Sequence, residues 1–102
     1  MFLDNYQNSV NQFLTSKDGF EITLKREDQL HPFISGNKFR KLKYNLIKAK
    51  QEGYETLLTF GGAFSNHLTA TAAAGKILGF NTIGIVRGEE DRKFNQSLQF
   101  CQ

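Results

Sequence analysis

The chain has 102 residues, of which 39% are hydrophobic and 23% are charged, and these ordinary values argue against intrinsic disorder. Thirteen basic and ten acidic residues give a formal net charge of +3 without a long block of like charges, so the composition does not indicate nucleic-acid binding. The single cysteine, Cys101, excludes an internal disulfide and a cysteine-cluster metal site.

The N-terminal region has neither the basic start nor the apolar run of a secretory signal peptide. The longest apolar stretches, such as LLTF at 57–60, are far too short to span a bilayer. We therefore expect a protein of the reducing cytoplasm that has no membrane partner.

The first predicted element is a strand over residues 20–27, FEITLKRE, in which apolar and polar residues alternate as in a half-buried strand. Pro32 and Gly36 then indicate a loop. His31 in this loop is predicted to be a surface residue. It has no partner at metal-ligand spacing, so we predict no metal site.

A helix is predicted from Asn37 to about Gln51, with Asn37 as its N-cap and Lys38 as its first helical residue. Gly53 occupies the position of a C-terminal glycine. The apolar residues have helical spacing and are predicted to face the core: Phe39, Leu42, Leu46 and Ala49.

Two further strand–helix pairs complete the chain. Residues 56–60 form a continuous apolar run that is typical of a strand buried on both faces, and a small-residue helix over 67–78 ends at Gly79. A second buried strand follows at 81–88, and a last helix is predicted over 89–102. This alternation predicts an α/β fold in which three strands pair in parallel through right-handed crossovers.

The last helix reaches the final residue without a cap, and a three-stranded sheet leaves an unpaired edge. These two features predict that the chain is the front part of a longer protein. Cys101, near the end of this helix, is predicted to be a core residue rather than a nucleophile.

The turn GGAFSN at 61–66 follows a predicted strand, at the position where parallel α/β sheets bind ligands. Free N–H groups and the dipole at a helix start suit a carboxylate or a phosphate, and Ser65 and Asn66 add polar groups there. Alternatively, this is a glycine turn in which Ser65 or Asn66 is an ordinary N-cap. His67 follows and is interpreted as either a structural or a ligand-contacting residue.

Lys38 is predicted at the positive end of a helix dipole, which disfavours a protonated amine. Lys41, one turn along the same face, adds like-charge repulsion. Both effects favour the neutral amine that forms Schiff bases. Alternatively, Lys38 and the neighbouring cations form a solvated helix face.

The motif G-N-K-x-R-K-L lies in the stretch LKREDQLHPFISGNKFRKLKYNL, and the motif G-G-x-x-S-N-H lies in LLTFGGAFSNHLTATAAAGKILGF. A third stretch, TIGIVRGEE, follows them. Over about residues 21–90 they resemble the N-terminal third of the 1-aminocyclopropane-1-carboxylate deaminase/D-cysteine desulfhydrase family. That family belongs to the tryptophan-synthase-β-like (type II) pyridoxal-phosphate enzymes. The resemblance implies part of a three-layer α/β/α fold with a parallel sheet. Residues 1–53 would carry the cofactor lysine, and residues 54–102 would begin the smaller α/β subdomain.

The resemblance also implies roles for individual residues. Lys38 would form the Schiff base with pyridoxal 5'-phosphate, supported by Asn37 and tuned by Lys41. Asn66 would lie against the pyridine ring and reach its 3-hydroxyl oxygen. The substrate carboxylate would be held by three consecutive residues, Ser65, Asn66 and the amide of His67. Lys38 and Ser65 are thus the candidate catalytic residues.

The implied function is a pyridoxal-phosphate-dependent deaminase or lyase that releases ammonia and a 2-oxo acid from a small amino acid. The substrate would be of the 1-aminocyclopropane-1-carboxylate or D-cysteine type, and the full-length protein would be a homodimer. Phe64 departs from the glutamine usual in the family, which leaves the exact substrate open. The phosphate cup and the partner of the pyridine nitrogen are expected beyond Gln102.

Two other functions remain open from the sequence. The chain could be a non-catalytic fragment of such an enzyme. It could also be a small basic module that binds nucleic acid through five residues of the predicted helix, Lys38, Phe39, Arg40, Lys41 and Lys43.

Overall fold

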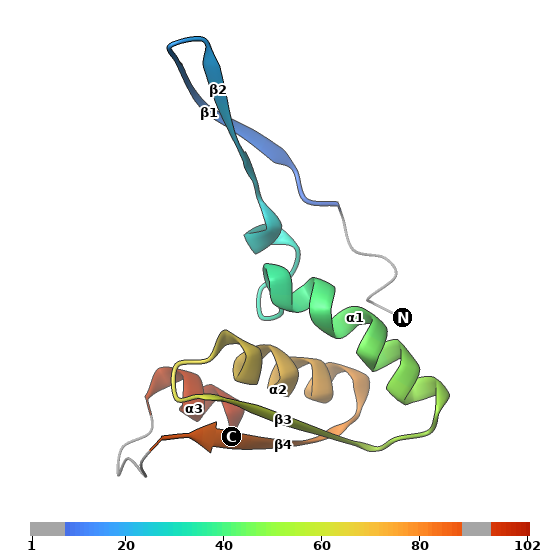
Figure 1. Ribbon diagram of the computed structural model, residues 1–102. Coiled ribbons are helices and arrows are strands. Elements are labelled where there is room, and N and C mark those ends of the chain that lie inside the picture. Colours follow the sequence, from blue (N-terminus) through green and yellow to red (C-terminus); the bar gives the residue numbers. More distant parts are fainter. Residues whose placement is uncertain (1–7, 89–94) are drawn as a thin grey trace.

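The computed structural model describes residues 8–88 and 95–102. A β-hairpin projects from a body in which helices cover a parallel sheet (Figure 1). The elements, in chain order, are β1 (Asn11–Lys17), β2 (Phe20–Lys25), the short 3-10 helix η1 (Glu27–Gln29), α1 (Asn37–Gln51), β3 (Thr56–Gly62), α2 (Asn66–Leu78), β4 (Asn81–Arg87) and α3 (Gln96–Cys101). None of these helices combines the length and the apolar composition needed to cross a membrane.

The hairpin corrects the prediction for the first strand. β2 pairs antiparallel with β1, a strand that the sequence reading missed, and all residues of both strands are exposed. The two residues between them, Asp18 and Gly19, both have positive φ, as a tight hairpin turn requires. Because this turn folds the chain back locally, β2 meets an antiparallel partner instead of joining a parallel sheet. The predicted half-burial is also wrong for residues 20–25, which are exposed, whereas Arg26 and Glu27 are half-buried.

The parallel sheet consists of β3 and β4, which pair from Thr56 with Asn81 to Gly62 with Arg87. The helix α2 connects them, so β3, α2 and β4 form a βαβ unit. Gly75 of α2 lies so close to β4 that a Cβ there would collide with the side chain of Thr82. The α/β class with a parallel sheet is therefore confirmed.

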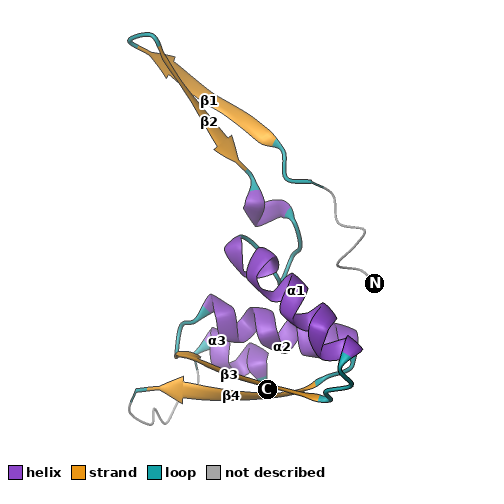
Figure 2. Cartoon of the chain, turned by 45° about the vertical axis from the view of Figure 1, so that its right-hand side comes forward, coloured by secondary structure: helices purple, strands orange, loops and turns teal. Residues whose placement is uncertain are grey.

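The described helices lie on one side of this sheet: α2 and α3 are next to it, and α1 packs against α2 (Figure 2). The opposite side exposes four large apolar side chains, Leu58, Phe60, Ile83 and Ile85. The prediction that residues 56–60 are buried on both faces is thus wrong in this structure. The strand has the expected apolar composition, but no described element covers its second face.

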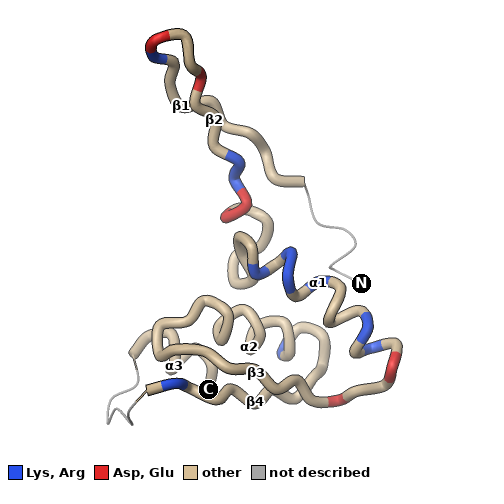
Figure 3. The backbone as a smooth tube through the Cα atoms, viewed as in Figure 1, with Lys and Arg blue, Asp and Glu red and all other residues tan. Residues whose placement is uncertain are grey.

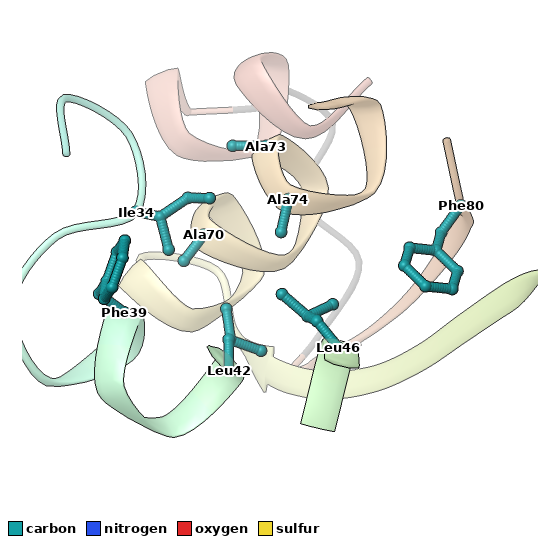
Figure 4. Close-up of a cluster of buried hydrophobic side chains, with 8 residues drawn as sticks. All are labelled: Ile34, Phe39, Leu42, Leu46, Ala70, Ala73, Ala74 and Phe80. Atoms are coloured by element: carbon teal, nitrogen blue, oxygen red, sulfur yellow. The ribbon is translucent and has the colours of Figure 1, made fainter. Parts of the chain in front are cut away.

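The core lies between α1 and α2 (Figure 4). The apolar face predicted for α1 is confirmed, since Phe39, Leu42 and Leu46 are buried and Ala49 packs against them. The small residues of α2 let the two helices approach closely. The buried cluster comprises Ile34, Phe39, Leu42, Leu46, Ala70, Ala73, Ala74 and Phe80. Burial of each large side chain in this cluster contributes about 1.5–3 kcal/mol.

The helix ends agree with the sequence in part. Gly53 and Gly79 follow α1 and α2 with positive φ, as predicted. The N-cap of α1 is Gly36 rather than Asn37. Gly36 has a φ of 61°, a non-helical conformation that glycine adopts easily, so the helix begins at the next residue. Lys38 is therefore the second helical residue. The predicted last helix starts in residues 89–94, which lie outside the described residues; α3 begins after its N-cap, Asn95.

Candidate functional site

A cleft of about 410 Å³ lies where the loop before α1, the first turns of α1 and α2, and the helix α3 meet. Its polar lining includes Asn37 and Lys38 from the first motif and Asn66 from the second. Thr69 and Ser97 add hydroxyl groups. The fold thus brings together three of the predicted site residues, which come from two separate segments of the sequence.

The first turn of α1 positions Lys38, which is half-buried at the cleft. Two residues before Lys38, Gly36 donates its N–H to the backbone carbonyl of Glu27 at 2.9 Å. Two residues after Lys38, the Arg40 guanidinium donates to both carboxylate oxygens of Glu27, at 2.9 and 3.0 Å. Ser9 donates its hydroxyl to the same carboxylate at 2.6 Å.

The hydrogen bonds from Arg40 and Ser9 lower the pKa of Glu27 to about 2, although partial desolvation opposes the shift. Figure 3 shows the acidic η1 next to the basic start of α1. One of the cations that the sequence placed around Lys38 is therefore engaged in an ion pair. No periodicity signals this pair, because its members are held together by the intervening loop.

Ser65 caps the first turn of α2. Its Oγ accepts hydrogen bonds from the N–H groups of His67 (3.2 Å) and Leu68 (3.4 Å). Ser65 is thus the N-cap, one of the two alternatives that the sequence left open. Gly61 is required at this turn, since a Cβ there would lie 2.8 Å from Ser65 Oγ. The side chain of Asn66, the first residue of α2, is exposed and lines the cleft.

His67 connects the two motifs electrostatically. Desolvation lowers its pKa, and the positive charges of Lys38 and Lys41 lower it further. Burial and the cations at the start of α1 thus favour the neutral form of the imidazole. Its backbone N–H, predicted to hold the substrate carboxylate, donates to Ser65 Oγ in this structure.

The loop before α1 is ordered by His31, whose Nδ1 accepts the N–H groups of Phe33 and Ile34, both at 3.1 Å. His31 is half-buried, and burial lowers its pKa. The prediction of a surface residue is thus wrong: the imidazole is an acceptor that turns the chain, which lets Ile34 enter the core. Because Nδ1 accepts both hydrogen bonds, the neutral imidazole carries its proton on Nε2.

Phe33 and Phe100 form an apolar wall of the cleft, with stacked rings whose centroids are 5.4 Å apart. Phe100 reaches the cleft because α3 is fixed to the β3–α2 turn: Asn95 donates its side-chain amide to the carbonyl of Ala63 at 2.8 Å. The sequence reading missed both aromatic residues. A loop residue and a late helix residue share no spacing that would have linked them.

A second cavity of about 520 Å³ lies between the sheet, α2 and α3. Its lining is mostly apolar and includes Leu68, Leu98 and Cys101, but none of the predicted site residues. Burial raises the pKa of the Cys101 thiol, which disfavours a reactive thiolate. Although this cavity is the larger one, the chemistry of its lining makes it the weaker candidate.

The nucleic-acid alternative relied on five residues of α1. Phe39 is fully buried and is not part of an exposed surface, and Arg40 pairs with Glu27. Within the described ranges, no group of three His, Cys, Asp or Glu side chains is arranged to hold a metal ion.

No family model matches the chain, but individual proteins do. A provisionally named 1-aminocyclopropane-1-carboxylate deaminase of Pyrococcus abyssi is 42% identical over 80 residues, which are 78% of this chain and 24% of that protein. The bifunctional D-cysteine desulfhydrase/1-aminocyclopropane-1-carboxylate deaminase of Arabidopsis thaliana is 40% identical over 69% of this chain and 18% of its own length. The D-cysteine desulfhydrase of Salmonella paratyphi A is 38% identical over 72% and 22%, respectively.

Comparison of the fold with solved structures finds a relative of the same kind. The crystal structure of a homologue of 1-aminocyclopropane-1-carboxylate deaminase superposes with a TM-score of 0.75 and 36% identity, over 85% of this chain and 28% of that one. The chain thus spans about a quarter of the length of the relatives that it matches. Over that shared segment, sequence and fold confirm the resemblance of the chain to the 1-aminocyclopropane-1-carboxylate deaminase/D-cysteine desulfhydrase family.

Proposed function

We propose that the chain supplies the cofactor lysine and the substrate-binding turn of a pyridoxal-phosphate-dependent deaminase or desulfhydrase. The observation that carries this proposal is the cleft in which Lys38 and Asn66 meet. The names of the relatives support the activity. The proposed substrate is a small amino acid of the 1-aminocyclopropane-1-carboxylate or D-cysteine type, and the products are ammonia and a 2-oxo acid.

The residues of the cleft fit the chemistry of this cofactor. Lys38 offers a primary amine to the aldehyde, and the side-chain amides of Asn37 and Asn66 offer donors and acceptors to a polar aromatic ring. Phe33 and Phe100 offer an apolar wall. When bound, pyridoxal phosphate supplies the electron sink for negative charge at the α-carbon of the substrate.

The proposed roles of the protein groups come from the family resemblance. Lys38 would hold the cofactor through its amine and would move a proton at or near the α-carbon of the substrate. Asn37 supports Lys38, and Asn66 orients the cofactor ring. The dipole at the start of α2, with Ser65 and the neighbouring N–H groups, holds the substrate carboxylate.

Three broader proposals rest on the same resemblance. Residues 1–53 form the segment that carries the cofactor lysine, and residues 54–102 begin the smaller α/β subdomain. The protein of which they are part acts as a homodimer in the cytoplasm. Phe64, which is 80% exposed, lies outside the cleft lining and meets the substrate side chain only when further parts of the enzyme enclose it.

Reduction with borohydride in the presence of pyridoxal phosphate tests the proposal, because it fixes the cofactor to the lysine that binds it. Peptide mass mapping is expected to find the tag on Lys38. Lys38→Ala should abolish the main tag, whereas Lys76→Ala, which changes an exposed lysine in the last turn of α2, should not. A main tag on Lys41 or Lys43 that persists in Lys38→Ala would refute the assignment.

A further inference from the structure

We infer that Glu27 is a positioning residue for Lys38, and that it fixes the first turn of α1 against the loop that lines the cleft. This inference rests on the proposed function of Lys38. Glu27 itself lies outside the cleft lining, so it acts through its contacts rather than by touching a ligand.

Glu27 is bonded to α1 on both sides of Lys38. Its backbone carbonyl accepts the N–H of Gly36, the N-cap two residues before Lys38, at 2.9 Å. Its carboxylate accepts two hydrogen bonds from the guanidinium of Arg40, two residues after Lys38: from Nε at 2.9 Å and from Nη2 at 3.0 Å. A bidentate contact of this kind fixes orientation as well as distance. The path of the backbone through Lys38 is thus held at two points by one residue.

The same residue closes the loop that precedes α1. Because Gly36 returns to the carbonyl of Glu27, residues 28–35 form a loop whose two ends meet. Within this loop, His31 turns the chain and Phe33 lines the cleft. Contacts of Glu27 therefore fix both the helix turn that carries Lys38 and the loop that carries the aromatic side of the cleft.

Further contacts hold Glu27 and the helix α1 in place. Ser9 donates to the Glu27 carboxylate at 2.6 Å, which fixes the carboxylate from the side of the hairpin. The apolar side of α1 holds the helix on α2, with Phe39 and Leu42 buried next to Lys38. Packing thus fixes the helix as a whole, whereas Glu27 fixes the rotation and the start of its first turn.

The structure provides a matched control on the same 3-10 helix. Arg26 donates to both carboxylate oxygens of Asp28, at 2.9 and 2.7 Å, and this pair has the chemistry of the Glu27–Arg40 pair. Its two members are two residues apart in the sequence, and their contact does not involve α1. Removing the Asp28 charge therefore removes an equivalent ion pair without releasing Lys38.

The test measures labelling of Lys38 relative to Lys76 in the 102-residue chain, with pyridoxal phosphate and cyanoborohydride, by quantitative peptide mapping. Glu27→Gln removes the carboxylate charge, and Arg40→Lys retains the cation but loses the bidentate geometry. Both variants should lower the Lys38:Lys76 ratio, by about twofold to fivefold for an exposed bidentate pair. Asp28→Asn should leave the ratio unchanged. The double variant, Glu27→Gln with Arg40→Lys, should have about the same Lys38:Lys76 ratio as either single variant, because each substitution removes the same contact.

Unfolding would also lower the ratio, because both lysines would then be equally accessible. Circular dichroism at the same pH separates the two cases, since loss of positioning leaves the helix content of the variants unchanged. If Glu27→Gln and Arg40→Lys keep the wild-type ratio while Lys38 is the main tagged residue, the positioning role is wrong and the proposed function stands. If the wild-type chain shows no preference for Lys38, the proposed function itself fails, and the role of Glu27 fails with it.

Discussion

Lys38 in the first turn of α1 and Asn66 at the start of α2 line the same cleft, although a strand, a turn and most of a helix separate them in the sequence. The charge of Lys38 also reaches the neighbouring residue His67, where it helps to lower the imidazole pKa. An amine and the first residue of a helix thus face one cleft. This juxtaposition is what a cofactor lysine and a carboxylate-binding turn require.

Substitution of Ser65 should separate its two roles. Ser65→Ala removes the N-cap of α2 and should destabilise the chain by about 1 kcal/mol in urea unfolding. Ser65→Asn keeps a capping side chain and should restore most of that stability. In the active enzyme both variants should lower turnover, on the order of 10²-fold for loss of one positioned donor, while the cofactor stays bound. Wild-type turnover in both variants would show that Ser65 only caps the helix.

The Glu27 carboxylate predicts an acid-sensitive contribution to stability. Its pKa is lowered from 4.5 to about 2 by Arg40 and Ser9, so the unfolded chain binds a proton before the folded chain does. This contribution is complete above the unfolded value and should be lost as the pH falls from about 4.5 toward 2. Urea unfolding at a series of pH values should show the loss in the wild type and a smaller loss in Glu27→Gln. Equal pH profiles of the two proteins would contradict the assignment.

The open side of the sheet predicts self-association. Leu58, Phe60, Ile83 and Ile85 form an exposed apolar face next to unpaired strand edges, and such surfaces promote association. Phe60→Lys should shift the sedimentation profile toward monomer at concentrations where the wild type associates. Tyr44→Lys, which changes an equally exposed ring on α1, should have little effect. A wild-type chain that is monomeric throughout would contradict this prediction.

The 102-residue chain alone should be a poor enzyme. It contains Lys38 and the turn at Ser65, but it spans only about a quarter of the length of its relatives, and the resemblance places the phosphate cup beyond Gln102. Pyridoxal phosphate should therefore dialyse away, and neither ammonia nor sulfide should be released from 1-aminocyclopropane-1-carboxylate or D-cysteine. Gel filtration and a turnover assay check this. A monodisperse chain that retains the cofactor and turns over either substrate would refute it.

The sequence predicted the parts of the fold that depend on local periodicity. The buried face of α1 and the glycine-terminated ends of α1 and α2 follow from helical spacing and from backbone freedom at Gly53 and Gly79. The hairpin was missed because the reading gave no weight to Asp18-Gly19, a recognised turn pair. The composition of residues 56–60 alone did not predict the open side of the sheet, because an apolar strand has the same sequence whether or not a neighbour covers it.

The candidate site was predicted where it lies in contiguous motifs and missed where it depends on tertiary contacts. Lys38 and Asn66 were recognised by their positions at helix starts, whereas the shift of the N-cap to Gly36 depends on the loop geometry. Glu27 and Arg40 belong to different elements and meet only because the loop between them closes. The stacking of Phe33 on Phe100 likewise requires α3 to be in place.

The central claim is that the cleft between the starts of α1 and α2 binds the cofactor. Titration of pyridoxal phosphate into the isotope-labelled chain, followed by amide chemical shifts, tests this claim most directly. The largest changes are expected at Asn37, Lys38 and Asn66, and they should be lost in Lys38→Ala. Changes confined to the second cavity, at Leu98 and Cys101, with none at Lys38, would contradict the claim.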